Sequence, residues 1–370
     1  MQIEIYNMIP VGENISISLE AVCDSFSSLL WDIEYYKCGA FEVYIAASPR
    51  NVEVFQTGRI VGRDDDREHF GLIESVELET DAEDGDYLII KGRFLMCLLE
   101  RRIIYPTFNF TKLVSYSQIV MNVVQYNACI SGIRKIPGLV VGCSSGTCWD
   151  TETKLQVSYD NLMEWVYTIC EKIGGTANIR LSKIADEQYE MIFELLQGTD
   201  RSILQKINPH IIFSDRYNNL LSFTYFTDTS VKKNYAYVLG KGEGEKRKRT
   251  IYFEGTEPSS LERYEVYVDA KDISDEEQIA NETKPISEIE YEELLKEKGK
   301  QNLVPTKTKS ESQIAVQSTQ FQYGVDYFVG DFVTVEHHRF GIRQNKIQLI
   351  GMIESFDRNG RNLTPTFKEE

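Results

Sequence analysis

The chain has 370 residues, enough for two or three domains, and its 42% hydrophobic and 26% charged residues are typical of a globular protein. The formal net charge of −17 disfavours a protein that grips nucleic acid, because neutralising phosphates requires clustered Lys and Arg. The N-terminus lacks the basic and apolar segments of a signal peptide, and no stretch approaches the roughly 18 apolar residues of a membrane helix, so we expect no membrane insertion.

The seven cysteines are odd in number, and most lie in apolar runs. This pattern favours buried free thiols in a reducing compartment over a disulfide framework. Cys143 and Cys148 could form half of a metal site, but no second pair has a matching spacing and the four His are scattered. We therefore expect no metal and no cofactor.

Residues 1–113 predict a first domain of short strands separated by charged turns. The acidic clusters Asp64–Asp66 and Asp81–Asp86 are expected to be solvated turns, because the second does not follow the order of an EF-hand calcium loop. The segment Arg93–Arg102 is apolar enough to be helix or strand. Closely spaced strands of this kind are typical of a small antiparallel barrel or sandwich. The strands are expected at 2–6, 27–36, 41–46, 59–62, 69–78 and 87–92.

Residues 114–205 predict a small α+β domain. Ser115-x-x-Gln118 is a capping-box pattern, and a helical apolar face follows it. A loop rich in Gly and Cys is expected over Ile136–Thr147. A second helix is expected from about Tyr159 to Ile173, ended by Gly174-Gly175. Strands are expected at 177–181 and 189–196.

Strands return in residues 206–370, which we expect to form a second β-domain with a polar and helical insertion at about 271–312. In the insertion, Ser287-x-x-Glu290 predicts a capped helix that ends at Gly299, with Glu292 placed to pair with Lys296. A polar linker is expected over Gln301–Ser312. The earlier strands of this domain are expected at 211–213, 220–227, 234–239, 248–254 and 264–268.

A loop rich in glycine and basic residues lies between two of these strands. It contains Gly240, Gly242 and Gly244 and continues to Arg249. The order of a phosphate-binding loop is absent, and a strand follows where a nucleotide site would have a helix. A long hairpin, or a loop that contacts a neighbouring subunit, explains the pattern better.

The stretch Phe321–Phe356 is expected to close the second β-domain. Two strand-like runs, Asp331–Glu336 and Ile347–Phe356, are separated by a polar turn that contains glycine. We expect Gly330-Asp331 to turn the chain into the first of these strands. The structural or assembly positions singled out in the chain are Gly324, Asp326, Tyr327, Gly330, Asp331, Gly240, Gly242 and Gly244.

Motifs for catalysis are missing from the sequence. It has no nucleophile elbow and no His-Glu-x-x-His motif. His337 and His338 are adjacent in an expected strand, so their rings point to opposite faces and cannot chelate one ion. No pair of carboxylates is singled out among the 57 acidic residues. We therefore predict that the protein is not an enzyme.

The order of several segments resembles the tail-hub proteins of siphoviruses and prophages, which are related to baseplate hubs and to the N-terminal part of tail-associated lysins. The segments in the second half are GKGEG followed by basic residues, SSLERYEVYVDAKD, EKGKQNL, YGVDYFVGDFVTV and ESFDRNG. Those in the first half are Gly39–Glu42, Gly71–Val76, Gly92–Phe94 and Arg101–Ile104. Together they cover nearly the whole chain.

The resemblance implies two tube-like antiparallel β-barrels with the small α+β domain between them. Three copies of such a chain form a ring, so that six similar barrels match a hexameric tail tube. The implied partners are further copies of the chain, a tail-tube or distal-tail protein, a tape-measure protein and tip or fibre proteins. DNA would pass through the pore without specific binding, which suits an acidic chain. The implied location is the virion tail, assembled in the host cytoplasm.

Two alternatives stay open at this point. A carbohydrate-binding or receptor-binding module would use aromatic residues such as Tyr35, Tyr36 and Trp149, although most aromatics lie in expected strands and belong to the core. A cell-wall hydrolase would use two carboxylates on a β-scaffold. Since the chain ends at Glu370, about ten residues after its last hub-like turn, we expect it to lack the hydrolase domain that follows some tail hubs.

Overall fold

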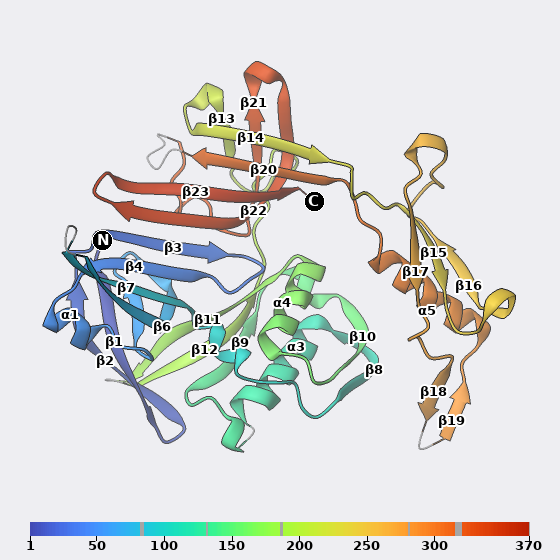
Figure 1. Cartoon of the computed structure of the whole chain (residues 1–370), viewed down its shortest axis with the longest axis horizontal. Helices are drawn as coiled ribbons and strands as arrows, with labels where there is room; N and C mark the ends of the chain where they lie inside the picture. The colour runs from blue at the N-terminus through green and yellow to red at the C-terminus, as the bar shows by residue number, and fades with distance from the viewer. Residues whose placement is uncertain (82–84, 131, 186–187, 280–281, 315–319, 370) are drawn as a thin grey trace. The chain divides into compact units, whose positions relative to one another are not determined.

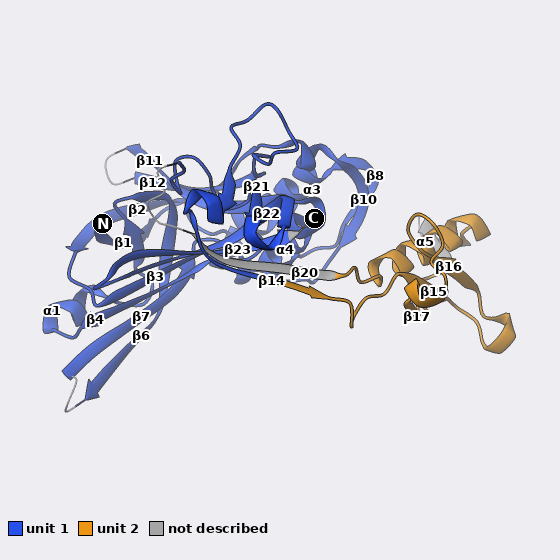
Figure 2. Ribbon diagram, turned by 90° about the horizontal axis from the view of Figure 1, so that it is seen from above, with its two compact units in different colours: residues 1–224, 311–370 blue, residues 225–310 orange. Residues whose placement is uncertain are grey.

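The computed structural model describes the chain except for residues 82–84, 131, 186–187, 280–281, 315–319 and 370. Two compact units are present (Figure 2). Unit 1 contains Met1–Thr224 and Glu311–Glu370, and unit 2 contains Tyr225–Ser310. The chain is mainly β, as expected, with 49% strand and 20% helix. The expected domain boundaries near residues 113 and 205 would divide unit 1 more finely and stay a prediction.

A large mixed sheet organises unit 1 (Figure 1). Its strands follow the order β11-β12-β2-β1-β5-β6-β7-β4-β3-β22-β23-β20-β14, with β9 beside β12 and β21 between β22 and β13. Among the described strands this path is open at both ends, and no closed barrel is found, so the two-barrel organisation stays a prediction. The strands are β1 (Ile3–Val11), β2 (Asn14–Cys23), β3 (Ser28–Glu34), β4 (Ala40–Ala46), β5 (Ile60–Arg63), β6 (Asp66–Asp81), β7 (Gly85–Phe94), β9 (Leu139–Ser144), β11 (Thr176–Ala185), β12 (Gln188–Leu196), β13 (Ile212–Ser214), β14 (Leu220–Asp228), β20 (Lys307–Ile314), β21 (Phe332–His337), β22 (Ile342–Asp357) and β23 (Gly360–Glu369).

The N-terminal strands curl around a core of their own. In β3 and β4, every second side chain is buried, which places Trp31, Phe41 and Val43 on the inner face. Residues of β1, β5, β6 and β7 reach the same cluster, together with Phe55. Phe55 follows the short helix α1 (Pro49–Val54). Strands on opposite sides of this part of the sheet therefore share one apolar interior.

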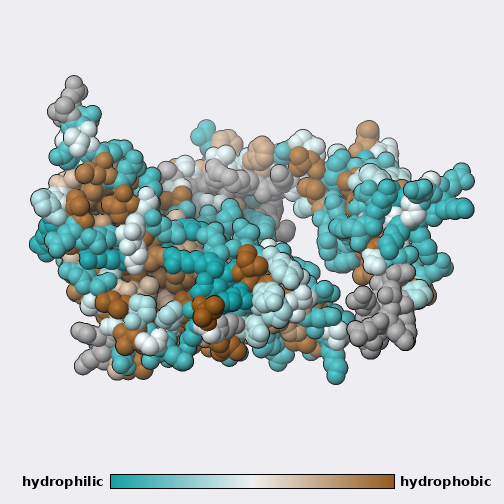
Figure 3. All heavy atoms as spheres, turned by 60° about the horizontal axis from the view of Figure 1, so that its bottom comes forward, coloured by the Kyte–Doolittle hydropathy of each residue, from teal (hydrophilic) through white to brown (hydrophobic). Residues whose placement is uncertain are grey.

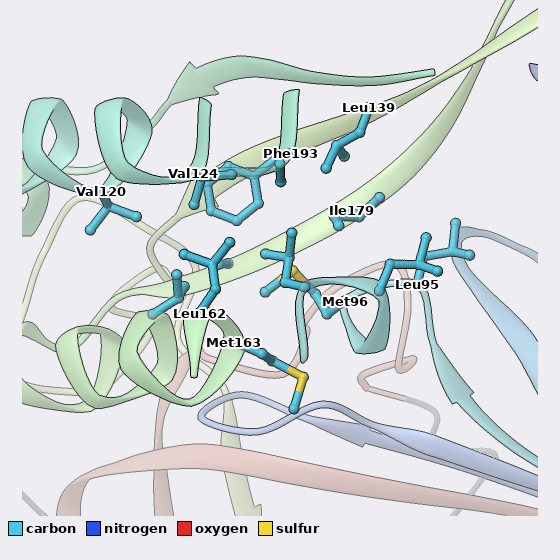
Figure 4. Close-up of a cluster of buried hydrophobic side chains, with 14 of the residues drawn as sticks. Leu95, Met96, Val120, Val124, Leu139, Leu162, Met163, Ile179 and Phe193 are labelled. Atoms are coloured by element: carbon cyan, nitrogen blue, oxygen red, sulfur yellow. The ribbon is translucent and has the colours of Figure 1, made fainter. Parts of the chain in front are cut away.

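Three helices cover another part of the sheet: α2 (Cys97–Glu100), α3 (Tyr116–Val124) and α4 (Leu162–Ile173). Figure 4 shows side chains from α3 and α4, and from Leu95 and Met96 just before α2, meeting those of β9, β11 and β12 in one buried cluster. Ser115 caps α3 and accepts a hydrogen bond from the N–H of Gln118, as the capping box predicts. Gly174, with φ of +76°, ends α4 in the left-handed conformation. Strands β8 (Phe108–Ser115) and β10 (Glu152–Val157) pair separately.

The expected loop over Ile136–Thr147 is wrong in part. Residues Leu139–Ser144 form β9, which pairs in parallel with β12. The buried side chain of Leu139 joins the core, so tertiary pairing decides the structure here rather than the local Gly and Cys content.

The C-terminal strands continue the N-terminal sheet. Strand β22 pairs with β3 from Gly351 opposite Glu34 to Phe356 opposite Leu29. It also pairs with β21 and β23, which confirms the expected closing hairpin of β21 and β22. A third core lies under these strands and includes Phe213, Tyr327 and Phe367.

Unit 2 contains a three-stranded sheet of order β16-β15-β17, made of β16 (Arg249–Tyr252), β15 (Tyr235–Leu239) and β17 (Glu265–Asp269). Helix α5 (Glu288–Gln301) packs Tyr291 and Leu295 against this sheet. Its capping box between Ser287 and Glu290 is complete, and its ion pair between Glu292 and Lys296 spans 2.7 Å, so both predictions are confirmed.

Two further strands of unit 2 pair with each other. Strands β18 (Glu276–Ile279) and β19 (Glu282–Pro285) form a hairpin. The polar linker expected over Gln301–Ser312 is wrong from Lys307 onward, because β20 joins the large sheet there.

The cysteines match the expected burial only in part, because Cys143 is exposed and Cys23, Cys38 and Cys148 are half-buried. All seven cysteines are free thiols, and Cys97, Cys129 and Cys170 are buried. Within the part of the chain that the structure describes, no helix has both the length and the apolar character needed to cross a bilayer.

Candidate functional site

Gly330 and Asp331 lie where segments from three regions of the chain meet, and we call this meeting point the junction. The Asp331 carboxylate is 3% exposed. It accepts hydrogen bonds from the Thr199 N–H at 2.7 Å, the Arg201 Nε–H at 2.8 Å and the Phe328 N–H at 3.1 Å. Phe332 and Thr199 also share a backbone hydrogen bond. The carboxylate therefore ties the start of β21 to the segment that follows β12.

Gly330 and Gly198 make this contact possible. Gly330 has φ of +102°, and a Cβ there would lie 2.2 Å from the ring of Tyr35. A Cβ at Gly198 would lie 1.9 Å from the carbonyl oxygen of Gly330. The Gly330 N–H donates to the carbonyl of Leu349 at 2.6 Å. Only residues without a side chain allow the three backbones to approach this closely.

Two tyrosines that follow β3 complete the junction. The Tyr35 hydroxyl donates to the Gly174 carbonyl at 3.2 Å and accepts from the Gly198 N–H at 2.9 Å. The Tyr36 hydroxyl donates to Gln348 Oε1 at 2.7 Å. Burial raises the pKa of Tyr36 to about 12, so its hydroxyl stays protonated and can donate at neutral pH.

The aromatic residues considered for receptor binding are not on the surface. Tyr35 is 3% exposed, Tyr36 is half-buried and Trp149 is fully buried. The Trp149 Nε1–H donates to the Leu196 carbonyl at 2.9 Å. These three residues belong to the core and the junction, and the receptor-binding interpretation loses the aromatics on which it was based.

Gly324, Asp326 and Tyr327 form a compact turn before the junction. The Gly324 N–H donates to the Tyr327 carbonyl at 3.1 Å, and the Asp326 carboxylate accepts from the Gln322 N–H at 2.7 Å. Tyr327 is 1% exposed, and its ring packs edge-on against Phe213 with 5.2 Å between centroids. The turn thus anchors the segment that leads into Gly330.

Gly240, Gly242 and Gly244 lie in unit 2, between β15 and β16, so the sequence positions singled out fall into two compact units. The loop is fixed within its own unit: the Lys241 N–H donates to the Tyr291 hydroxyl at 2.8 Å. Two of its cations are paired with carboxylates, Lys241 with Asp275 at 2.7 Å and Arg247 with Asp269. This pairing agrees with a structured hairpin loop and not with a cradle for phosphate.

A buried ion cluster that sequence reasoning missed connects β5 with β22 and β23. Arg63 is 1% exposed and Glu354 is 2% exposed, with 3.1 Å between Arg63 Nη1 and Glu354 Oε1. Asp65 pairs with Arg63 at 2.8 Å, and Arg361 also contacts Glu354. The Arg63 guanidinium lies 4.8 Å from the ring centroid of Phe356. No local pattern signals an ion pair whose partners are 291 positions apart.

Asp66 is expected to lie in a solvated turn, but its side chain is largely buried. Its carboxylate, 12% exposed, accepts from the Trp31 Nε1–H at 2.9 Å and lies 2.9 Å from His69 Nδ1. Burial alone would raise the pKa of Asp66, but His69 and backbone hydrogen bonds outweigh it and hold the pKa below its usual value. Burial alone would lower the pKa of His69, but Asp66 outweighs it and the pKa is raised. Residues 82–84 of the second acidic cluster lie outside the described residues.

The arrangement holds together strands that are far apart in the sequence. A cavity of about 420 Å³ adjoins the junction, and Tyr35, His69 and Asp331 line it. The carboxylate of Asp331 accepts three hydrogen bonds, and that of Asp66 is held by His69 and Trp31. Within the described ranges, no three His, Cys, Asp or Glu side chains are grouped so that they could hold a metal ion.

Comparison with known proteins identifies the family. The model of the siphovirus ReqiPepy6 Gp37-like proteins matches residues 3–367. The chain belongs to this family. The resemblance to siphovirus tail proteins is thereby confirmed across the whole chain. A search of curated proteins finds no match.

Solved structures of tail proteins share the fold of this Gp37-like chain. A tail protein from Neisseria meningitidis MC58 is 13% identical with a TM-score of 0.58, covering 100% of this chain and 96% of the other. The prophage MuSo2 43 kDa tail protein from Shewanella oneidensis is 12% identical with a TM-score of 0.58, covering 99% and 98%. Prophage tail protein gp18 from Listeria monocytogenes EGD-e is 11% identical with a TM-score of 0.55, covering 100% and 95%. The Gp37-like chain therefore has the fold of phage tail proteins along its full length.

Proposed function

We propose that the protein is a structural hub of a phage or prophage tail tip, in which three copies form a ring that joins the tail tube to the tip complex. The observation that carries this proposal is the match of nearly every residue to a siphovirus family, together with a fold shared end to end with tail proteins. A structural role needs a rigid subunit and no reactive group, and the junction and the ion cluster provide such rigidity.

The ring proposal rests further on how the β-rich parts of one chain are joined. The cores inside the N-terminal strands and under the C-terminal strands lie along one sheet, through the pairing of β3 with β22. If each core corresponds to one tube-like barrel, three copies present six such barrels to a hexameric tail tube. In this proposal residues 1–113 and 206–370 supply the two barrels, and residues 114–205 lie between them.

The proposed partners follow from that position. They are a tail-tube or distal-tail protein on one side, tip or fibre proteins on the other, and a tape-measure protein in the pore. The net charge of −17 would let DNA pass through the pore without sticking. The proposed location is the virion tail after assembly in the host cytoplasm, and we expect no release of fragments from purified peptidoglycan.

The mass of the particle in solution tests the proposal. Analytical ultracentrifugation of the chain, alone and co-expressed with the tail-tube protein of the same phage, should show three copies per particle. A chain that stays monomeric under both conditions would contradict the ring.

A further inference from the structure

A basic and apolar surface patch lies beside the N-terminus of α4. Residues Arg101–Tyr105 run next to Tyr159–Asn161, held by the hydrogen bond from the Ile104 N–H to the Asp160 carbonyl at 2.9 Å and by that from the Tyr159 N–H to the Ile104 carbonyl at 2.8 Å. A hollow of about 460 Å³ opens on this surface. We call its lining the arginine patch: Arg101, Arg102, Ile103, Tyr105, Arg134 and Tyr159.

The arginine patch has the composition of a protein interface. Tyr159 is 68% exposed, Tyr105 is 56% exposed and Ile103 is 46% exposed, and the neighbouring Ile133 is fully exposed. Figure 3 shows one face of the molecule, on which hydrophobic residues form separate clusters within a mostly hydrophilic surface. Tyrosine and arginine are enriched at the centres of protein interfaces.

Tyr159 and two of the arginines on this surface are held by hydrogen bonds to backbone carbonyls of the same chain. Tyr159 has φ of +60°, a left-handed conformation that is rare for tyrosine and costs free energy. Arg102 Nε donates to the Arg134 carbonyl at 2.5 Å, and Arg134 Nη1 donates to the Tyr105 carbonyl at 3.1 Å. Burial, and then the neighbouring charges of Arg134 and Arg101, lower the pKa of Arg102.

The same unit carries a surface of opposite charge. Strands β6 and β7 extend as a hairpin, paired out to Asp81 and Gly85, and we call its described residues 76–81 and 85–90 the acidic arm. These residues include four acids, Glu77, Glu79, Asp81 and Asp86, and no Lys or Arg. Glu77, Glu79 and Asp86 are exposed. On its other side, β6 pairs with β5 only over Asp66–Leu72, so the arm also presents a strand edge without a partner in that ladder.

The arm and the patch are placed to meet between copies and not within one copy. Figures 1 and 2 agree that the tip of β6 and β7 points away from α4, whose N-terminus adjoins the patch. Contact between different surfaces of neighbouring copies is heterologous, and such contacts close into a ring when the rotation between copies allows it.

We propose that the acidic arm of one copy docks on the arginine patch of the next copy, with Glu77 and Glu79 facing Arg101 and Arg102 around the exposed ring of Tyr159. The proposal rests on the ring described above and names its subunit contact. The partner is a second copy because the chain itself supplies the complementary charge.

Charge reversal with rescue tests the contact. The trimer dissociation constant is measured by sedimentation for Arg101→Glu, for Glu79→Lys and for the double variant. Each single variant should weaken association about tenfold or more, and the double variant should recover most of the loss. Lys206→Glu, an exposed change of the same charge in unit 1, is the matched control and should have no effect. Tyr159→Gly should also weaken association while leaving the thermal midpoint unchanged or higher, because glycine relieves the positive φ.

The outcomes separate this inference from the function on which it rests. If the wild-type chain forms trimers and the single variants associate equally well, or if the double variant does not recover, the arm and the patch do not meet and only the ring stands. If the wild-type chain stays monomeric, both alone and with the tail-tube protein, then the proposed ring is wrong and the proposed contact is wrong as well.

Discussion

Replacing Asp331, a residue that is 3% exposed, with alanine should destabilise unit 1 by about 3 kcal/mol, worked from three hydrogen bonds to its carboxylate. Losing the bond from Thr199 leaves a backbone N–H unsatisfied at about 2 kcal/mol, and losing that from Phe328, a residue that is 47% exposed, adds about 1 kcal/mol. The bond from Arg201 adds little, because its side chain is 19% exposed and regains contact with water. Denaturant unfolding followed by tryptophan fluorescence measures the change, since all three tryptophans lie in unit 1.

Asp326→Ala is the matched control for this experiment. Asp326 accepts one backbone hydrogen bond, from Gln322, and it is only half-buried, so its loss should cost about 1 kcal/mol. The reasoning would be refuted if the two variants lost equal stability, or if Asp331→Ala shifted the unfolding midpoint no more than the control. The loss of stability in Asp331→Asn should lie between those of the two alanine variants, because the amide keeps one acceptor oxygen and places an NH2 donor against the remaining N–H groups.

Three further predictions concern single contacts. Gly330→Ala should lower the free energy of unfolding by about 3 kcal/mol or more, because the new Cβ meets an aromatic ring. Gly324→Ala has open space around the new Cβ and should lower it by about 1 kcal/mol. Equal denaturant midpoints for the two variants would contradict this. The raised pKa of His69 gives stability that is complete below its unfolded pKa of about 6.5 and is lost as pH rises through the folded pKa. The lowered pKa of Asp66 gives stability that is present above about pH 4 and is lost as pH falls. Thermal midpoints should therefore fall above about pH 6.5, and His69→Gln should flatten that slope. Ser287→Ala should destabilise unit 2 by about 1 kcal/mol through loss of the α5 cap, which circular dichroism of the melting transition can measure; an unchanged transition would count against a role of the cap.

Local signals in the sequence were sufficient for several elements of the fold. The capping box at Ser287 and Glu290, the ion pair of Glu292 with Lys296 and the helix end at Gly174 depend on residues within four positions of each other. Such contacts form in any context that keeps the helix, so spacing alone predicts them.

Features decided by distant segments could not be predicted in this way. Leu139–Ser144 is a strand because β12 lies beside it, and Asp66 is buried because Trp31 of β3, 35 positions earlier, donates to it. Of the candidate site, the importance of Gly330-Asp331 could be predicted from its position before a strand. Its donor Thr199, 132 positions earlier, could not.

The pairing of β3 with β22 has a consequence for the order of synthesis on the ribosome. Met352 is roughly 320 positions after its partner Ile33, so at 5–20 residues per second β3 is made roughly 15–60 s before its neighbour. Unit 2 is complete in sequence before β22 is made, and its own core can form in that interval. Until β22 arrives, the nascent chain exposes an open strand edge, which is a hazard for aggregation. Expression at low temperature or with chaperones that shield nascent chains should therefore raise the yield of folded protein.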